Sequence, residues 1–421
     1  MDARERELHD LSGLVGDLLA RTHKRSYLGV VRGGELHIVL ERGQQGMPRL
    51  PGLERRIGDN AHAQSRGDRG MKAARLHAYH EALKLDEVDE PSVTGPLDVV
   101  VRIGAAGLCR TDLHIQEGQW AEKSEVQLPY TPGHENAGWI HEVGSAVTNV
   151  EVGDTVIVHP FITCGLCRAC RSGDDIHCEN GSFPGIDRDG GFAEFLLTSA
   201  RSVVKLDPSL QPADIAALAD AGLTAIHAVK KAIGVLGAGT RVVVIGAGGL
   251  GHIGIQCLKA YTPTEIIVVD PSEPALELAR ELGADHTVKV DGSHVNAVRE
   301  LTDGRGTQAV IDFVGENGAV QDGVAMIEDG GFYYVIGYGQ NLDIPTIDVI
   351  SREISFIGNL VGTYNDLQDL MTLTAQGKVT LHTSTYPLDA INDAMADLDN
   401  GRLQGRGILV PASVPARAAA A

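Results

Sequence analysis

A glycine-rich turn between an apolar strand pattern and a helical pattern most constrains how this chain can fold. Residues 241–245 (R-V-V-V-I) have the composition of a buried strand, and residues 250–261 have a helical pattern. Glycines between them permit a tight turn and let the backbone approach a diphosphate, whose charge the helix N-terminus favours. We therefore predict a strand–turn–helix unit that binds a dinucleotide through its turn residues, Gly246, Gly248, Gly249, Leu250 and Gly251.

A carboxylate, Asp270, directly follows the next strand pattern, residues 265–269. In this arrangement a carboxylate accepts hydrogen bonds from the adenosine ribose of the cofactor. It also repels a 2′-phosphate, and the next residues, Pro271 and Ser272, offer no arginine to receive one. Asp270 therefore completes the predicted cofactor site and favours NAD over NADP. A mere tight turn is the alternative interpretation of the glycines, and the complete strand–helix–strand context argues against it.

Two sequence patterns divide most of the chain, whose 421 residues are enough for two or three domains. From Met71 to about residue 215, short strand patterns such as 97–103 and 138–143 are separated by Gly and Pro turns. This pattern is typical of a barrel-like, mostly β lobe. After residue 215, strand and helix patterns alternate, which is typical of an α/β fold with a doubly wound parallel sheet.

Four cysteines follow the spacing C-x2-C-x2-C-x7-C, at Cys164, Cys167, Cys170 and Cys178. Four thiolates close a tetrahedral shell around zinc and leave no open position, so the cluster predicts a structural zinc site. Disulfide pairing is one alternative, but no secretory signal supports it. An iron–sulfur run is another, but its usual fourth spacing is x3 followed by Pro, whereas Glu179 follows here.

The formal net charge of −20 argues against nucleic acid or an anionic membrane as a partner. The sequence has no apolar run long enough to span a bilayer, and its charged first residues precede no signal-type core, so we predict a cytoplasmic protein. Residues 1–70 are rich in arginine and contain no motif that we can assign to chemistry. We predict that they form a poorly ordered extension, or that Met71 is the true start.

Three further segments contain metal-ligand side chains, but their spacing alone does not join them. Cys109 lies in G-L-C-R-T-D-L-H, His134 and Glu135 lie in P-G-H-E-N-A-G, and Asp220 lies in D-A-G-L-T-A. Together with the four-cysteine segment and V-I-G-A-G-G-L-G, these motifs have the order and spacing of the zinc-dependent medium-chain alcohol dehydrogenases. From Met71 to Pro411 the chain resembles that family, and residues 1–70 lie outside the resemblance.

The resemblance implies a catalytic zinc held by Cys109, His134 and Asp220, with Glu135 as an exchangeable fourth ligand. The third ligand is commonly Cys in the family, and the aspartate here resembles the branch of bacterial secondary-alcohol dehydrogenases. A carboxylate is a legitimate zinc ligand. Together with the four-cysteine cluster, the expected content is two Zn²⁺ per chain.

The resemblance also implies roles for side chains around this zinc. Thr111 matches a hydroxyl that hydrogen-bonds the substrate oxygen, and His114 matches a histidine that relays the proton outwards by way of the cofactor ribose. Arg110 and Arg406 match residues that contact the cofactor pyrophosphate in some members. Simpler alternatives, a surface histidine and two solvated arginines, stay open. The residues expected to face the substrate are Trp120, Phe161 and Leu360.

The implied reaction is the reversible oxidation of a primary or secondary alcohol to an aldehyde or ketone, by hydride transfer to NAD with the alkoxide on zinc. The implied α/β fold has a GroES-like β-barrel catalytic domain, residues 71–225 plus 356–415, and a six-stranded doubly wound parallel sheet (Rossmann) for the cofactor, residues 226–355. Residues 416–421 form a tail. Members of the family are homodimers or homotetramers, and we expect the same here.

Two alternative functions stay open. The nearest is an NADPH-linked aldehyde or ketone reductase, or a polyol dehydrogenase, on the same scaffold. The alternative of another class is a non-catalytic zinc- and dinucleotide-binding protein.

Overall fold

The computed structural model describes residues 28–32, 35–39, 70–403 and 405–414. Two compact units divide the chain, Met1–Ser65 and Arg66–Ala421. In the first unit, strands β1 (Leu28–Arg32) and β2 (Glu35–Val39) pair antiparallel. The rest of the predicted extension, up to residue 69, lies outside the described residues.

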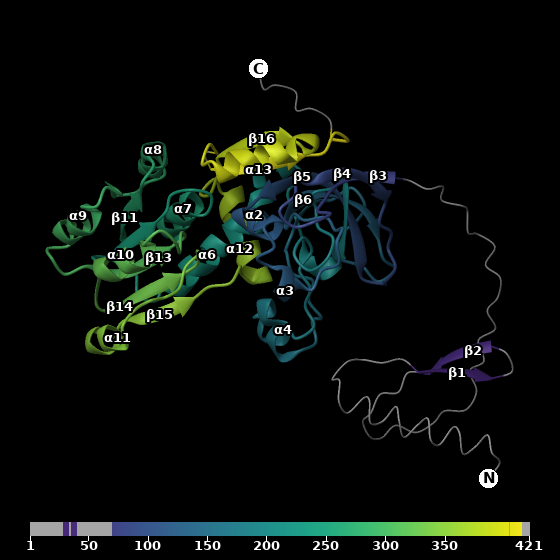
Figure 1. The fold of residues 1–421 in the computed structure, drawn as a ribbon, viewed down its shortest axis with the longest axis horizontal. Coiled ribbons are helices and arrows are strands. Elements are labelled where there is room, and N and C mark those ends of the chain that lie inside the picture. The colour runs from purple at the N-terminus through teal and green to yellow at the C-terminus, as the bar shows by residue number, and fades with distance from the viewer. Residues whose placement is uncertain (1–27, 33–34, 40–69, 404, 415–421) are drawn as a thin grey trace, which may run out of the picture. The chain divides into compact units, whose positions relative to one another are not determined.

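A six-stranded parallel sheet forms one half of the second unit, with the strand order β12-β11-β10-β13-β14-β15 (Figure 1). Its strands are β10 (Arg241–Ile245), β11 (Glu265–Asp270), β12 (His286–Lys289), β13 (Thr307–Asp312), β14 (Ile327–Val335) and β15 (Ser355–Gly358). Its helices are α6 (Ala221–Ala232), α7 (Gly251–Tyr261), α8 (Glu273–Glu281), α9 (His294–Leu301), α10 (Ala319–Met326), α11 (Thr346–Arg352) and α12 (Tyr364–Ala375).

Alternate residues of the central strands enter opposite cores. Val242 and Val244 pack in one core with residues of α6 and α7, whereas Val243 and Ile245 pack in the other with residues of α9 and α10. Because helices cover both faces, the middle residues of these strands are apolar on both sides of the sheet. The doubly wound parallel sheet predicted from the alternation is confirmed. Its strand order reverses between β10 and β13, and ligands of such sheets bind at the carboxyl ends of the strands there.

A second, mostly antiparallel sheet has the order β16-β17-β5-β6-β7-β9, with β8 also paired to β5. Its strands are β5 (Asp98–Leu108), β6 (Glu135–Val143), β7 (Thr155–Val158), β8 (Phe195–Ser199), β9 (Val203–Lys205), β16 (Thr383–Pro387) and β17 (Arg406–Val410). A separate pair joins β3 (Gly70–Arg75) to β4 (Lys84–Asp89). The helices of this half are α2 (Arg110–Gln116), α3 (Ala121–Ser124), α4 (Arg168–Ser172), α5 (Pro212–Ile215) and α13 (Ile391–Asp399).

Strand β5 is longer than the sequence pattern indicates. The apolar run predicts residues 97–103, but the strand continues through the small residues Ala105, Ala106 and Gly107 to Leu108. Those residues have low strand propensity, and pairing with β6 and β17 on either side holds them extended. The extension matters because it delivers Cys109 to the junction of the two halves.

The predicted domain boundaries fall inside elements of the structure. Helix α6 crosses residues 225 and 226, and β15 crosses residues 355 and 356. We propose to draw the cofactor domain so that it includes β15, since that strand pairs with β14. Among the described residues, no helix is both long and apolar enough to cross a membrane.

Candidate active site

The glycine turn after β10 has the close packing that its sequence predicts. Gly246 has a φ of +88°, a conformation that favours glycine. A Cβ on Gly251 would lie 1.7 Å from the carbonyl oxygen of Gly246, so any larger residue would push α7 away from the turn. The turn therefore places the N-terminus of α7 at the carboxyl end of β10, beside the space beyond that end of the sheet.

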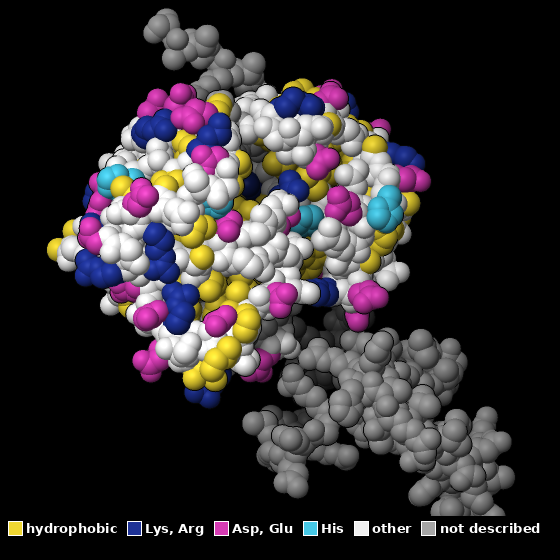
Figure 2. All heavy atoms as spheres, turned by 60° about the vertical axis from the view of Figure 1, so that its left-hand side comes forward, with side chains coloured by type: hydrophobic (Ala, Val, Ile, Leu, Met, Phe, Trp, Pro, Cys, Tyr) yellow, Lys and Arg dark blue, Asp and Glu magenta, His cyan; other side chains and the backbone are white. Residues whose placement is uncertain are grey.

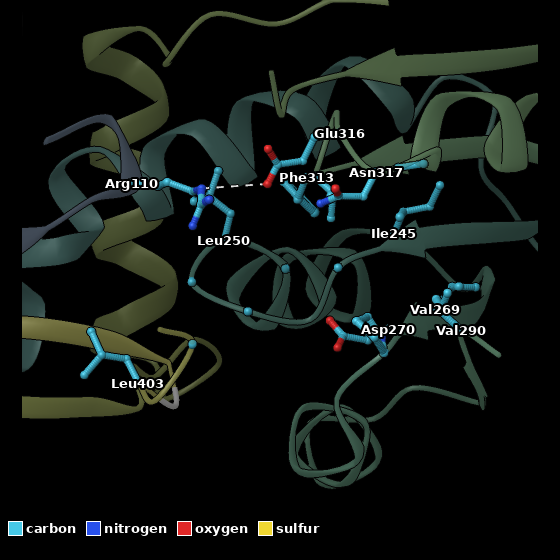
Figure 3. A pocket seen from close by; sticks show the side chains of 18 of the residues that line it. Arg110, Ile245, Leu250, Val269, Asp270, Val290, Phe313, Glu316, Asn317 and Leu403 are labelled. Atoms are coloured by element: carbon cyan, nitrogen blue, oxygen red, sulfur yellow. Dashed lines mark ion pairs between the residues drawn. The ribbon is translucent and has the colours of Figure 1, made fainter. Parts of the chain in front are cut away.

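A cleft of about 410 Å³ opens at this turn, between the two halves of the unit. Figure 3 shows side chains from β10, β11 and the loop after β13 facing it from the cofactor half, with Arg110 and Leu403 on the other side. In the space-filling view of Figure 2, this face of the molecule is hollowed, with basic side chains visible in the hollow. All five predicted turn residues line the cleft: Gly246, Gly248, Gly249, Leu250 and Gly251.

Asp270 lies at one end of the cleft, where its carboxylate is held by the backbone. One oxygen accepts a hydrogen bond from the Ala247 N–H at 2.8 Å, and the other accepts one from the Ser272 N–H at 2.7 Å. The carboxylate is thus fixed between the glycine turn and the end of β11. Cys109 and Arg406 also line the cleft. The cleft therefore connects the predicted cofactor-binding residues with the predicted metal ligands.

Arg110 lines the same cleft and forms an ion pair across it. Its Nε lies 3.7 Å from Oε1 of Glu316, in the loop after β13 (Figure 3). The arginine predicted to contact a pyrophosphate thus already faces a carboxylate of the cofactor half. Both side chains are partly exposed, so the pair is worth little energy and can exchange for a phosphate.

Four potential metal ligands from distant segments come together beside this cleft. Cys109 follows β5, His134 precedes β6, Glu135 begins β6, and Asp220 caps α6. One ligand atom from each lies within 4.8 Å of the others, and all four residues are buried. A thiol, an imidazole and carboxylates are ligands that zinc accepts. The donor set therefore fits a zinc ion.

His134 is oriented by carboxylates on both sides of its ring. Its Nε2 lies 3.5 Å from Asp220 Oδ2, and its Nδ1 lies 3.3 Å from Oδ1 of Asp112, on α2. Burial alone lowers the pKa of His134, but Asp112, Asp220 and Cys109 raise it well above its ordinary value. Anionic groups thus surround this imidazole. In metal sites, a carboxylate commonly binds the ring nitrogen of a histidine ligand that does not face the metal, and so orients the ring. Asp112 has this position, and the sequence analysis missed it although it lies in the Cys109 motif.

Within the described part of the chain, only one of the two carboxylate oxygens of Glu135 accepts hydrogen bonds. Its Oε1 accepts hydrogen bonds from the Ala221 N–H and from the buried guanidinium of Arg406. Its Oε2 is buried, and no hydrogen-bond partner for it occurs in the described part of the chain. Burial raises the pKa of Glu135, while the charge of Arg406 acts in the opposite direction. An oxygen left without a partner at this position fits an intermittent metal ligand.

Three predicted residues converge on a side chain that sequence reasoning missed. The Tyr338 hydroxyl lies 3.1 Å from Thr111 Oγ1, 2.9 Å from His114 Nδ1 and 3.3 Å from Trp120 Nε1. Tyr338 belongs to the loop between β14 and α11, in the cofactor half. Nothing in the sequence around it has a recognisable motif, so its role could not be inferred before the fold was known.

The other two predicted pocket residues have different surroundings. Phe161 packs against Phe183 with ring centroids 4.4 Å apart, and Phe183 meets the His134 ring edge-on at 5.9 Å. Phe161 is therefore one ring removed from the candidate ligands. Leu360 lies between β15 and α12 and is 48% exposed, so its place in a pocket stays a prediction.

The four-cysteine segment forms a second cluster of potential ligands. One sulfur from each of Cys164, Cys167, Cys170 and Cys178 lies within 4.8 Å of the others, and none forms a disulfide. The N–H groups of Leu166 and Cys167 point at the sulfur of Cys164 and lower its pKa to about 6. Such N–H···S contacts favour the thiolate form that binds metal. The donor set again fits zinc.

Comparisons with known proteins agree with this geometry. Residues 95–208 match the family described as alcohol dehydrogenase GroES-like domain, and residues 249–376 match the zinc-binding dehydrogenase family. The chain is 37% identical to D-arabinose 1-dehydrogenase (NADP(+)) of Saccharolobus solfataricus, over 81% of this chain and 97% of the relative. It is 36% identical to NAD-dependent alcohol dehydrogenase of Sulfurisphaera tokodaii, over 81% of this chain and 100% of the relative.

A solved structure is similar over the same share of the chain. The crystal structure of the alcohol dehydrogenase from Aeropyrum pernix has a TM-score of 0.79 and 49% identity, covering 81% of this chain and 100% of that one. Both halves of the fold predicted from the sequence, GroES-like and Rossmann, are therefore confirmed. The chain belongs to the zinc-dependent medium-chain alcohol dehydrogenase family.

Proposed function

We propose that this protein is a zinc- and NAD-dependent alcohol dehydrogenase, which reversibly oxidises a primary or secondary alcohol to an aldehyde or ketone. The observation that carries the proposal is the buried cluster of Cys109, His134, Glu135 and Asp220 beside a cleft lined by the glycine turn. A dinucleotide in this cleft would extend from Asp270 towards Cys109, which brings its reactive end to the candidate metal ligands.

Cys109, His134 and Asp220 would hold the zinc, and Glu135 would bind it intermittently. When bound, zinc supplies a Lewis acid for the alcohol oxygen, and NAD supplies the acceptor for the hydride. The partly buried aromatic pair Phe161 and Phe183 would limit the access of water to the site. Thr111 would hold the hydroxyl of the substrate by a hydrogen bond, and His114, which is partly exposed, would pass the proton to solvent.

To test this proposal, the full-length protein is assayed for turnover with a panel of primary, secondary and polyhydroxy alcohols and with the matching carbonyl compounds. We expect NADH to form only in the presence of an alcohol. A protein that binds NADH and zinc but turns over no alcohol and no carbonyl compound would instead be the non-catalytic alternative.

NAD is the proposed cofactor because of Asp270. Its carboxylate is fixed at the end of β11 by two backbone N–H groups, so it cannot easily turn away from a 2′-phosphate. The alternative is an NADP-linked polyol or aldose dehydrogenase. It is supported by the similarity to the relative named D-arabinose 1-dehydrogenase (NADP(+)). The substrate panel with both cofactors separates the two.

Replacing Asp270 with asparagine should relax the preference for NAD. Asparagine keeps an oxygen for the Ala247 N–H but removes the charge, so the ratio of kcat/KM for NADP over NAD should rise at least about tenfold. The exposed Asp303, between α9 and β13, is a matched control, and Asp303→Asn should leave the ratio unchanged. A wild-type protein that already prefers NADP, or an unchanged ratio in the variant, would contradict our interpretation of Asp270.

We further propose two zinc ions per chain, a cytoplasmic location and a homodimeric or homotetrameric state. The four-cysteine cluster supports the second zinc. All six cysteines are free thiols, as is usual in reducing compartments. The family resemblance supports the oligomer, and light scattering of the purified protein would test it.

A further inference from the structure

Tyr338 brings a hydroxyl group of the cofactor half to side chains of the catalytic half. It lies more than two hundred residues from Thr111 and His114 in the sequence, yet its oxygen is within 3.1 Å of Thr111 Oγ1 and 2.9 Å of His114 Nδ1. Its ring meets the His114 ring at 5.0 Å and the Trp120 ring at 6.3 Å, both edge-on. Three side chains of the α2–α3 region thus hold one phenol in place.

The hydrogen bonds around this phenol have only two consistent arrangements. An indole N–H can only donate, so the tyrosine oxygen accepts from Trp120. The phenol has a single proton, which it gives either to His114 or to Thr111. In the first arrangement Thr111 donates to Tyr338, which donates to His114. In the second, His114 donates to Tyr338, which donates to Thr111.

The net transfer of one proton along this chain of hydrogen bonds converts the first arrangement into the second. Thr111 takes the proton of the alcohol oxygen as it gives its own to Tyr338, and Tyr338 gives its own to His114 Nδ1. Each hydroxyl gains one proton and loses one, the alcohol loses one, and His114 gains one. NAD, when bound, would accept the hydride from the carbon.

The surroundings of His114 suit the end of such a chain. Burial lowers the pKa of His114, and so does the charge of Arg110, whereas Glu117 and Glu316 raise it. The net direction is downwards, so near neutral pH the imidazole is uncharged and can accept a proton. Because His114 is only partly buried, it can release that proton to water.

We propose that Tyr338 is a positioning residue that links Thr111 to His114 and carries the substrate proton between them. The inference rests on the proposed function. It adds a path through a side chain of this protein to the path by way of the cofactor ribose that the family resemblance implies.

The test compares Tyr338→Phe, His114→Gln and the double variant across a range of pH. Phenylalanine keeps the ring contacts and removes only the hydroxyl. We expect kcat for alcohol oxidation near neutral pH to fall at least about tenfold in each single variant. In the wild type, kcat should rise as pH increases through the pKa of His114, because the basic form accepts the proton, and this inflection should vanish in both variants. The double variant should be no slower than the worse single one.

Two controls separate the relay from a structural role. Tyr386→Phe removes a tyrosine hydroxyl of β16 that donates to Asp397 of α13, and it should keep the wild-type profile. In the protein without cofactor, Trp120 emission should follow the titration of His114 in the wild type and lose that dependence in Tyr338→Phe. Trp139, the other tryptophan of the chain, contributes a constant background.

An unchanged pH profile in Tyr338→Phe, or additive losses in the double variant, would overturn the proposal. Tighter NADH binding by Tyr338→Phe with unchanged kcat would overturn it too, since it would mean that the cofactor displaces the phenol. A wild-type protein without alcohol-dependent NADH formation would reject the proposed function itself, so the two failures are distinguishable.

Discussion

Replacing Cys109 with serine is expected to lower kcat for alcohol oxidation at least about a thousandfold while the protein stays folded. Cys109 is buried at the end of β5, and its sulfur is the only thiol among the four clustered ligands. A serine hydroxyl stays protonated at neutral pH and is a poor zinc ligand, so the variant should lose this metal. Losing a Lewis acid that stabilises transition-state charge by several kcal/mol corresponds to about three or more powers of ten in rate.

The measurement is steady-state kinetics together with zinc content per chain. Cys257→Ser is a matched control, because Cys257 is a buried thiol of α7 that does not belong to the ligand cluster. At a temperature below its melting point, the Cys257→Ser variant should have the kcat and the zinc content of the wild type. Wild-type rates in Cys109→Ser would show that the cluster is not the catalytic centre.

Replacing Cys164 with serine is expected to cost stability rather than chemistry. The four sulfurs of this segment enclose a site with no open position for a substrate, and Cys164 also accepts two backbone N–H groups. Losing a structural metal removes the binding energy that holds the segment. We expect a melting temperature lower by about 5–10 °C and an unchanged kcat per folded active site.

Thermal melting and active-site titration, run side by side, make this measurement. Leu166→Ala is the control within the same segment, because Leu166 is 72% exposed and the loss of an exposed side chain should change stability little. An unchanged melting temperature in Cys164→Ser would mean that the four cysteines do not hold a metal. A collapse of kcat per active site with stability intact would assign the cluster to chemistry instead.

Local patterns were enough to predict the elements that carry the cofactor. The glycine turn and Asp270 follow one another in the order that a strand–helix–strand unit requires. Their geometry depends on the backbone of the turn and on one local hydrogen bond, from the Ala247 N–H to Asp270. The catalytic ligands differ, because Cys109, His134 and Asp220 come from three separate segments. Spacing could not join them, and only the family resemblance did.

Contacts between the two halves could not be read from the sequence at all. Tyr338 reaches Thr111 and His114 only because the two halves pack against one another. Within the catalytic half, Arg406 reaches Glu135 because their strands, β17 and β6, lie on either side of β5 in one sheet. Asp112 is a different case, since it lies in the Cys109 motif and a carboxylate near a ligand histidine could have been sought. Strand β5 was drawn too short because its last residues are small, and their pairing partners lie far along the chain.

The most direct test of the account is a zinc-edge anomalous scattering map from crystals of the protein grown with zinc. We predict two peaks per chain, one of them about 2.0–2.3 Å from Cys109 Sγ, from a ring nitrogen of His134 and from a carboxylate oxygen of Asp220. The other peak should lie among the four sulfurs of Cys164, Cys167, Cys170 and Cys178. A map with density only among the four cysteines, and none at Cys109, would contradict the claim that three distant segments share a catalytic metal.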